Sequence, residues 1–137
     1  MARRGSLHHL EIWVGDLDAA QDSWGWLLGR LGYLLTEQFE RGQQWTAEDG
    51  CYVFLEAGPD RSSLHHDRRR AGMNHVAFWA GSRAELDRLV KASDRHGWSL
   101  LFADKHPFAG GPQHYAAYLE NREGFEVELV AQPEREQ

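Results

Sequence analysis

The sequence predicts an α+β protein of two tandem modules, each with the element order β-α-β-β-β. The first observation is an internal repeat, in which residues 73–82 resemble residues 7–16 at an offset of 75 − 9 = 66 positions. Each copy is followed by helix-capping residues and then by a pattern of helical spacing. Each helix is followed by three strand-like runs separated by turn residues. The repeat aligns His9 with His75, Trp13 with Trp79 and Gly15 with Gly81.

The first module begins with a strand over residues 7–14, whose alternation places aliphatic residues on one face and His9 on the other. Asp16 or Asp18 can cap the helix that follows, and Gly32 provides a left-handed stop. Strands are then predicted over residues 33–39, 44–47 and 51–57, with Asp49-Gly50 as a hairpin turn.

Residues 59–72 are polar, and we interpret them as a link between modules, for which a plain connector is a simpler explanation than a functional loop. The second module starts with a strand over residues 73–80, followed by a helix with Ser82 and Glu85 as a capping box and Gly97 beyond its end. Strands follow near residues 99–103, 114–120 and 125–130. A Gly- and Pro-rich segment, residues 104–113, is predicted to be irregular.

Length and composition favour one domain with an internal duplication: module one over about residues 6–58 and module two over about residues 73–131 of the 137-residue chain. A net charge of −6 argues against nucleic-acid or anionic-membrane partners and favours a small-molecule or protein partner. The single cysteine cannot form an intramolecular disulfide, and no apolar run has the length of a membrane span. We therefore expect a cytoplasmic protein.

Four residues of metal-ligand type stand on the strand faces that lack the aliphatic row. His9 and Glu56 are 56 − 9 = 47 residues apart, and His75 and Glu128 are 128 − 75 = 53 residues apart. A pseudo-twofold pairing of the modules would bring all four to one centre. Two imidazoles and two carboxylates suit a divalent ion such as Zn, Ni, Fe, Mn or Co. A single strand histidine is more often a hydrogen-bonded core or surface residue, so the repeated arrangement carries this prediction.

The chain resembles the vicinal oxygen chelate superfamily, which includes glyoxalase I, methylmalonyl-CoA epimerase, extradiol dioxygenases and the fosfomycin- and bleomycin-resistance proteins. The resemblance extends from about residue 7 to residue 130 and lies in residues 9–12 and 16–20, in the pair Asn74-His75 and in residues 121–129. The last run is similar to the family's Asp-Pro-x-Gly-x-x-x-Glu ending, with Asn121-Arg122 in place of Asp-Pro. The fold that the resemblance implies is a cupped mixed sheet around a metal and substrate cavity.

By this resemblance, His9, His75 and Glu128 fall on the family's metal-ligand positions, and Glu56 falls where glyoxalase-like members place a fourth ligand. The implied function is a metal-dependent lyase or isomerase that chelates two neighbouring substrate oxygens and stabilises an enolate or oxyanion, with Glu56 or Glu128 as the catalytic carboxylate. One alternative is a non-catalytic protein that binds an antibiotic and confers resistance. Another is an Fe(II) extradiol dioxygenase, which would use two histidines and one carboxylate.

Short two-module members of the family commonly form homodimers, so the resemblance also implies a site shared between subunits. His9 and Glu56 of one chain would then face His75 and Glu128 of its partner. The predicted pocket around the metal is lined by aromatic residues on the ligand faces and by residues of the loop before the seventh strand. Core packing would equally explain the aromatic residues, and an irregular connector would explain the loop residues. The predicted pocket residues are Trp13, Phe54, Trp79, His106, His114 and Tyr115.

Overall fold

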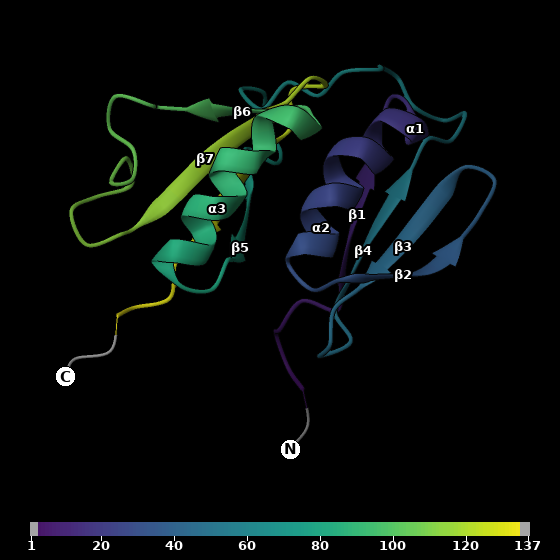
Figure 1. Ribbon diagram of the computed structural model, residues 1–137. Helices are drawn as coiled ribbons and strands as arrows, with labels where there is room; N and C mark the ends of the chain where they lie inside the picture. Colours follow the sequence, from purple (N-terminus) through teal and green to yellow (C-terminus); the bar gives the residue numbers. More distant parts are fainter. Residues whose placement is uncertain (1–2, 135–137) are drawn as a thin grey trace. The chain divides into compact units, whose positions relative to one another are not determined.

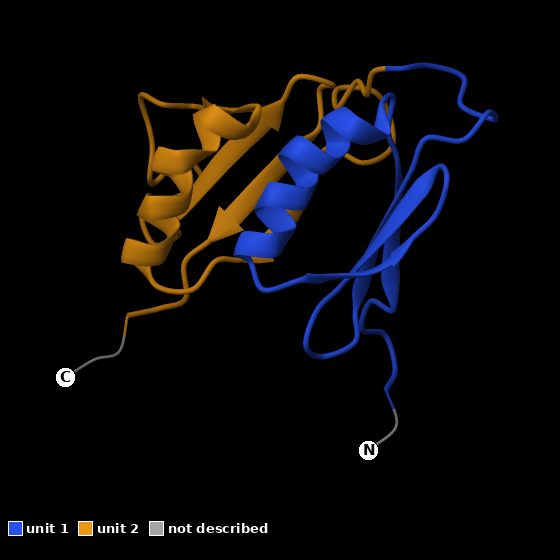
Figure 2. Ribbon diagram, turned by 45° about the vertical axis from the view of Figure 1, so that its right-hand side comes forward, with its two compact units in different colours: residues 1–64 blue, residues 65–137 orange. Residues whose placement is uncertain are grey.

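The structure of the chain, a computed structural model, describes residues 3–134. The described residues divide into two compact units, one ending at Leu64 and the next beginning at His65, which we call unit 1 and unit 2 (Figures 1 and 2). Each unit contains one four-stranded mixed sheet and one helical segment. In the described part of the chain, no helix is long and apolar enough to cross a membrane.

Unit 1 has its strands in the order β1-β4-β3-β2, with β1 parallel to β4 and the other neighbours antiparallel. The strands are β1 (His9–Trp13), β2 (Leu34–Gln38), β3 (Gly42–Thr46) and β4 (Tyr52–Glu56). The helical segment between β1 and β2 consists of α1 (Leu17–Ala20), a π-helical turn η1 (Gln21–Gly25) and α2 (Trp26–Arg30).

Capping and packing explain why this part of the sequence folds as it does. The Asp16 carboxylate accepts hydrogen bonds from the first amides of α1, and Gly32 takes a left-handed conformation after α2. Leu27 and Leu28 of α2 are fully buried with Leu55 of β4, so apolar helix and strand faces form one core. The opposite face of the sheet carries His9 and leaves it exposed.

Unit 2 repeats the plan with the strand order β5-β8-β7-β6, again with the first pair parallel. Its strands are β5 (Val76–Trp79), β6 (Trp98–Leu101), β7 (Ala116–Asn121) and β8 (Glu126–Val130). The helix α3 (Arg83–Ser93) continues into a short 3-10 turn η2 (Asp94–His96) and packs against the sheet (Figure 1).

The second core forms by the same rules. The Ser82 hydroxyl accepts a hydrogen bond from the Glu85 amide at 3.1 Å, which caps α3, and Gly97 ends η2 with φ of 85°. Val127 and Leu129 of β8 are fully buried against the helix side. Strand alternation therefore directs Glu128, the residue between them, to the other face of the sheet.

The predicted α+β class and the two β-α-β-β-β modules are confirmed, with strand ends shifted by at most three residues. The predicted linker over residues 59–72 is not a uniform connector. Its second half belongs to unit 2, where the His66 ring stacks on Phe125 with centroids 4.6 Å apart and the His66 amide donates to the Glu123 carbonyl. A polar composition alone cannot reveal this packing, because the stacked ring and the backbone bond join residues far apart in the sequence.

Candidate metal centre

The polar face of the unit 2 sheet converges on one carboxylate, that of Glu128. This residue stands in the middle of β8 and is 7% exposed. The His75 Nε2 atom lies 3.0 Å from Glu128 Oε1, and the His114 Nε2 atom lies 2.5 Å from Oε2. The Tyr118 hydroxyl also hydrogen-bonds to Glu128. His75 precedes β5, His114 precedes β7 and Tyr118 lies in β7, so three segments place polar groups on a single β8 side chain.

The neighbour of His75 fixes which ring nitrogen carries its proton. His75 Nδ1 lies 2.6 Å from the side-chain oxygen of Asn74. The Asn74 amide nitrogen donates to the Arg68 carbonyl at 3.1 Å, which assigns the orientation of the amide. An amide oxygen only accepts hydrogen bonds, so His75 Nδ1 must be the donor. The neutral ring is therefore the Nδ1–H tautomer, with a lone pair on Nε2.

That lone pair points at a carboxylate oxygen, and this contact requires a positive charge. A neutral His75 would oppose its Nε2 lone pair to Glu128 Oε1 at 3.0 Å, and two acceptors do not attract each other. Either a proton on Nε2 or a cation held by both atoms satisfies the contact. Two ligands about 2.1 Å from one ion at tetrahedral or octahedral angles are about 3.0 to 3.4 Å apart. His75 Nε2 and Glu128 Oε1 thus suit two ligands of one divalent ion.

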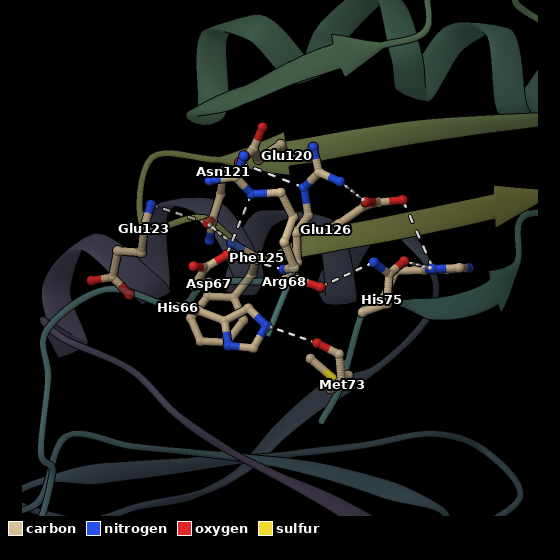
Figure 3. A network of polar contacts seen from close by, with 12 residues as sticks. His66, Asp67, Arg68, Met73, His75, Glu120, Asn121, Glu123, Phe125 and Glu126 are labelled. Carbon is tan, nitrogen blue, oxygen red and sulfur yellow. Dashed lines mark hydrogen bonds and ion pairs between the residues drawn. The ribbon is translucent and has the colours of Figure 1, made fainter. Parts of the chain in front are cut away.

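A second carboxylate near His75 is already neutralised. Glu126 is 3% exposed, and its Oε1 lies 3.0 Å from Arg68 Nη1, an ion pair whose angles are not those of a hydrogen bond (Figure 3). Its Oε2 is 3.8 Å from His75 Nδ1 (Figure 3), whereas Glu128 contacts the other ring nitrogen, Nε2. A buried carboxylate requires such a partner, since desolvation of an unpaired charge is costly. Arg68 leaves Glu128 as the carboxylate available to a ligand.

Burial and negative charge act together on Tyr118. Burial is the largest cause that raises the pKa of its phenol, followed by the charge of Glu128, the hydrogen bond to Glu128 and the charge of Glu126. Its hydroxyl therefore keeps its proton throughout the neutral range and remains a donor to Glu128.

In unit 1, His9 has different surroundings. Its ring stacks on Tyr52 with centroids 4.6 Å apart, and its Nδ1 lies 2.9 Å from Nδ1 of His8. The strand register pairs His9 with Tyr52 and Trp13 with Glu56. Glu56 is therefore four residues further along the sheet from His9, about 13 Å at about 3.3 Å per residue. This separation is too large for His9 and Glu56 of one unit to hold the same ion.

Glu56 was predicted to occupy the place in unit 1 that Glu128 occupies in unit 2, but the strand registers show that the two positions do not correspond. In unit 2, Ala77, two residues after His75, pairs with Glu128. In unit 1, the corresponding residue two positions after His9 is Glu11, which pairs with Phe54. The Phe54 ring lies over Gly42, where a Cβ atom would approach it to 2.9 Å. Unit 1 thus has an aromatic ring at the place where unit 2 has its carboxylate. Residue type and similar chain separation could not reveal this two-residue offset.

The other predicted pocket residues lie in different surroundings. The Trp13 indole donates to Glu11 at 2.7 Å, and Trp79 is 71% exposed. His106 precedes a cis peptide bond to Pro107 in the loop before β7. The Tyr115 hydroxyl donates to Asp87 of α3 at 2.7 Å, so this side chain faces the helix. His114 is the predicted pocket residue that contacts Glu128 directly.

Across residues 3–134, no group of three or more His, Cys, Asp or Glu side chains forms a complete metal site. This is consistent with the contacts around Glu128, because His75 and His114 approach different oxygens of that carboxylate. Unit 2 provides two suitable ligand atoms, His75 Nε2 and Glu128 Oε1, and a third group that binds the second oxygen. Further ligands must come from elsewhere, including substrate or water.

Comparison with known proteins agrees with this fold. The profile of the Glyoxalase/Bleomycin resistance protein/Dioxygenase superfamily matches residues 8–118. The uncharacterized protein YqjT of Bacillus subtilis is 37% identical over 125 residues, which cover 91% of this chain and 98% of that protein. The chain therefore belongs to the Glyoxalase/Bleomycin resistance protein/Dioxygenase superfamily.

Solved structures share the fold. A candidate glyoxalase from Bacillus halodurans is 40% identical with a TM-score of 0.85, and the match covers 94% of this chain and 97% of that chain. A lactoylglutathione lyase from Agrobacterium tumefaciens has a TM-score of 0.62 at 17% identity, with 95% and 96% of the two chains covered. At that identity the likeness concerns the fold alone.

Several residues of the site were not predicted from the sequence. Asn74 stands beside a predicted ligand, and its amide could have suggested a hydrogen-bond partner for the ring. Alternation places Glu126 on the same strand face as Glu128, but no role in the site was predicted for it. Tyr118 lies four residues after His114, so the same period-two alternation could have placed it on the face of the ligands. Arg68 gave no usable signal, because it lies in a polar segment that has no regular structure.

Proposed function

We propose that this chain is a metal-dependent enzyme of its superfamily, which binds a divalent ion through His75 Nε2 and Glu128 and acts on a small molecule with two neighbouring oxygens. One observation carries the proposal. Asn74 commits Nδ1 of His75 as a donor, so the lone pair of Nε2 faces Glu128 Oε1 at 3.0 Å, and a divalent cation held by both atoms satisfies this contact. Zn, Ni, Fe, Mn and Co all accept this imidazole and carboxylate pair.

A bound divalent ion would act as a Lewis acid that stabilises negative charge on substrate oxygens. The residues of the chain supply the surroundings. Asn74 orients the imidazole of His75, and Arg68 neutralises Glu126 behind it. The low exposure of Glu128 keeps its carboxylate out of bulk water, where its charge interacts more strongly with a cation. Superfamily membership supports an enzyme, and lyase or isomerase chemistry is the specific form that we propose.

The remaining parts of the site are proposed from the family resemblance. His9 is the second imidazole that the resemblance assigns to the same ion, within a homodimer that shares its sites between subunits. Glu56 is better suited to a role as general base than to a position equivalent to Glu128, because Phe54 occupies that position in unit 1.

The position of Phe54 favours a second candidate function. With Phe54 in place of a second carboxylate, the ligand set becomes two histidines and one carboxylate, which is the set that non-haem Fe(II) oxygenases use. Oxygen-dependent ring cleavage of a catechol by the Fe(II)-loaded protein would support this candidate. Isomerisation or addition without oxygen consumption would support the first one.

Metal affinity tests the proposal directly. The full-length protein, stripped of metal, is titrated with Zn²⁺ and Co²⁺ by calorimetry beside His75→Ala, Glu128→Gln and the control His96→Ala, which alters a histidine at the end of η2. We expect one ion per chain in the parent and the control, and at least a hundredfold weaker binding in the two site variants. Binding of parent strength in either site variant would refute the site. Failure of the parent to bind any ion would support the non-catalytic binding protein instead.

A further inference from the structure

We propose that His114 is a positioning residue, which holds the Oε2 atom of Glu128 so that Oε1 is presented to an ion shared with His75. The inference rests on the proposed metal-dependent function and adds to it a residue that is not itself a ligand. It starts from the different contacts of the two carboxylate oxygens. Oε1 faces His75 Nε2 at 3.0 Å, and Oε2 faces His114 Nε2 at 2.5 Å.

The two imidazoles present different groups to the carboxylate. An ionised carboxylate only accepts hydrogen bonds, so the close contact at Oε2 requires a hydrogen on His114 Nε2. His75 Nε2 has no hydrogen in the neutral ring, because Asn74 holds the proton on Nδ1. Oε2 is therefore satisfied within the protein, and Oε1 faces a lone pair. This asymmetry is what a carboxylate with one coordinating oxygen needs, since its other oxygen must be hydrogen-bonded.

The loop between β6 and β7 is shaped to hold His114 in this position. Gly110 lies against both residues that donate hydrogen bonds to Glu128. A Cβ atom at position 110 would be 2.6 Å from the Tyr118 hydroxyl and 2.7 Å from Cδ2 of the His114 ring. The His114 amide donates to the Gly111 carbonyl at 3.2 Å. Absence of a side chain at position 110 thus permits the approach of the loop backbone to both rings. Contacts with the loop backbone and with Glu128 therefore define the position of the His114 ring.

Geometry also separates this role from that of a third ligand. His114 and His75 address different oxygens of the same carboxylate, and no three such side chains in the described residues form a complete metal site. A second hydrogen-bonding group, the Tyr118 hydroxyl, acts on the same carboxylate. Loss of His114 should therefore weaken the hold on the ion without removing a coordinating atom.

The test measures metal binding in the full-length protein. His114→Ala, His114→Gln and the control His96→Ala, a histidine at the end of η2, are compared with the parent in competition titrations with Zn²⁺. Pulsed EPR of bound Cu²⁺ then counts the coordinated imidazoles. We expect His114→Ala to bind about tenfold to a hundredfold more weakly, with the parent's number of imidazoles. His114→Gln should recover part of this loss, because its amide can donate to Oε2, and His96→Ala should behave as the parent.

Two results would overturn the inference. Parent-like affinity in His114→Ala would remove its positioning role, and the loss of one imidazole from the EPR count would make it a ligand. Melting temperatures of the metal-free proteins show whether His114→Ala is folded. If it is not, His114→Gln decides between the outcomes, and we expect it to bind the ion more weakly than the parent with an unchanged imidazole count. These outcomes differ from failure of the proposed function, in which the parent binds no ion or His75→Ala binds as tightly as the parent.

Discussion

Removal of the Asn74 side chain should weaken metal binding through the tautomer of His75. In Asn74→Ala, Nδ1 loses its acceptor at 2.6 Å, so the neutral ring can place its proton on Nε2 and donate to Glu128 Oε1. A proton in that position competes with the ion for both atoms. Loss of a residue that holds a metal ligand by a hydrogen bond costs about tenfold to a hundredfold in metal affinity.

The exposure of the ring sets where in this range the effect should fall. The His75 side chain is 32% exposed, so water can replace part of the lost bond. We therefore expect a decrease of roughly 10- to 30-fold in the Zn²⁺ association constant, equal to about 1.4 to 2 kcal/mol at 1.36 kcal/mol per tenfold. Competition titration at neutral pH measures it. Gln113→Ala, which removes an exposed amide from the loop before β7, is the matched control.

Nitrogen NMR of the metal-free protein supplies a second, independent readout. The parent should show His75 as the Nδ1–H tautomer, and Asn74→Ala should show an increased share of Nε2–H. Unchanged affinity together with an unchanged tautomer in Asn74→Ala would refute the reasoning that assigns the lone pair of Nε2 to the ion.

Three further predictions concern other parts of the chain. Glu56→Gln should lower turnover by about a hundredfold or more while Zn²⁺ affinity stays near that of the parent, since an amide cannot accept a proton at neutral pH; full turnover would place Glu56 outside the chemistry. Tyr115→Phe should lower stability by about 0.5 to 1 kcal/mol at neutral pH, because the exposed hydroxyl loses its bond to Asp87. The hydrogen bond to Asp87 is the largest cause that raises the pKa of Tyr115. Its contribution to the free energy of unfolding is therefore complete below the unfolded pKa of about 10 and is lost as pH rises through the folded pKa. A stability difference between parent and variant that persists well above about pH 10 in denaturant titrations would contradict this. Refolding His9→Ala together with Glu128→Ala should restore activity if homodimers share their sites, because one site then contains neither lesion, whereas two inactive parents that stay inactive after verified subunit exchange would assign each site to one chain.

The sequence was sufficient for the fold because the signals for it are local. Period-two alternation around Val127 and Leu129 identifies a strand and its core face, and both residues are fully buried. The Ser82 cap and the Gly97 stop mark the ends of the second helical segment within a few residues. The same local rules could not predict the π-helical turn η1, since it depends on how the first helical segment packs.

The site was only partly predictable, because side-chain contacts depend on strand register. His75 and Glu128 were predicted to act together, and they do lie in contact. Glu56 was grouped with them by residue type, but the pairing of β1 with β4 puts Phe54 at the matching place. A register shift of two residues keeps a side chain on the same face of the sheet, so alternation cannot detect it.

The loop before β7 illustrates the other limit. His114 was predicted as a pocket residue from composition, and its contact with Glu128 depends on the turn at Gly110 and Gly111. Loop conformations of this kind follow from tertiary contacts and have no periodic signal in the sequence.

The coordination of His75 tests the central claim most directly. The full-length protein, labelled with ¹⁵N at histidine and stripped of metal, is titrated with Zn²⁺ and followed by nitrogen NMR. The structure predicts that Nε2 of His75 shifts to the range of a metal-bound imidazole nitrogen at one equivalent of ion, while Nδ1 keeps its proton and its bond to Asn74. Saturation with Zn²⁺ that leaves the His75 nitrogens unchanged, or that binds through Nδ1, would contradict the account.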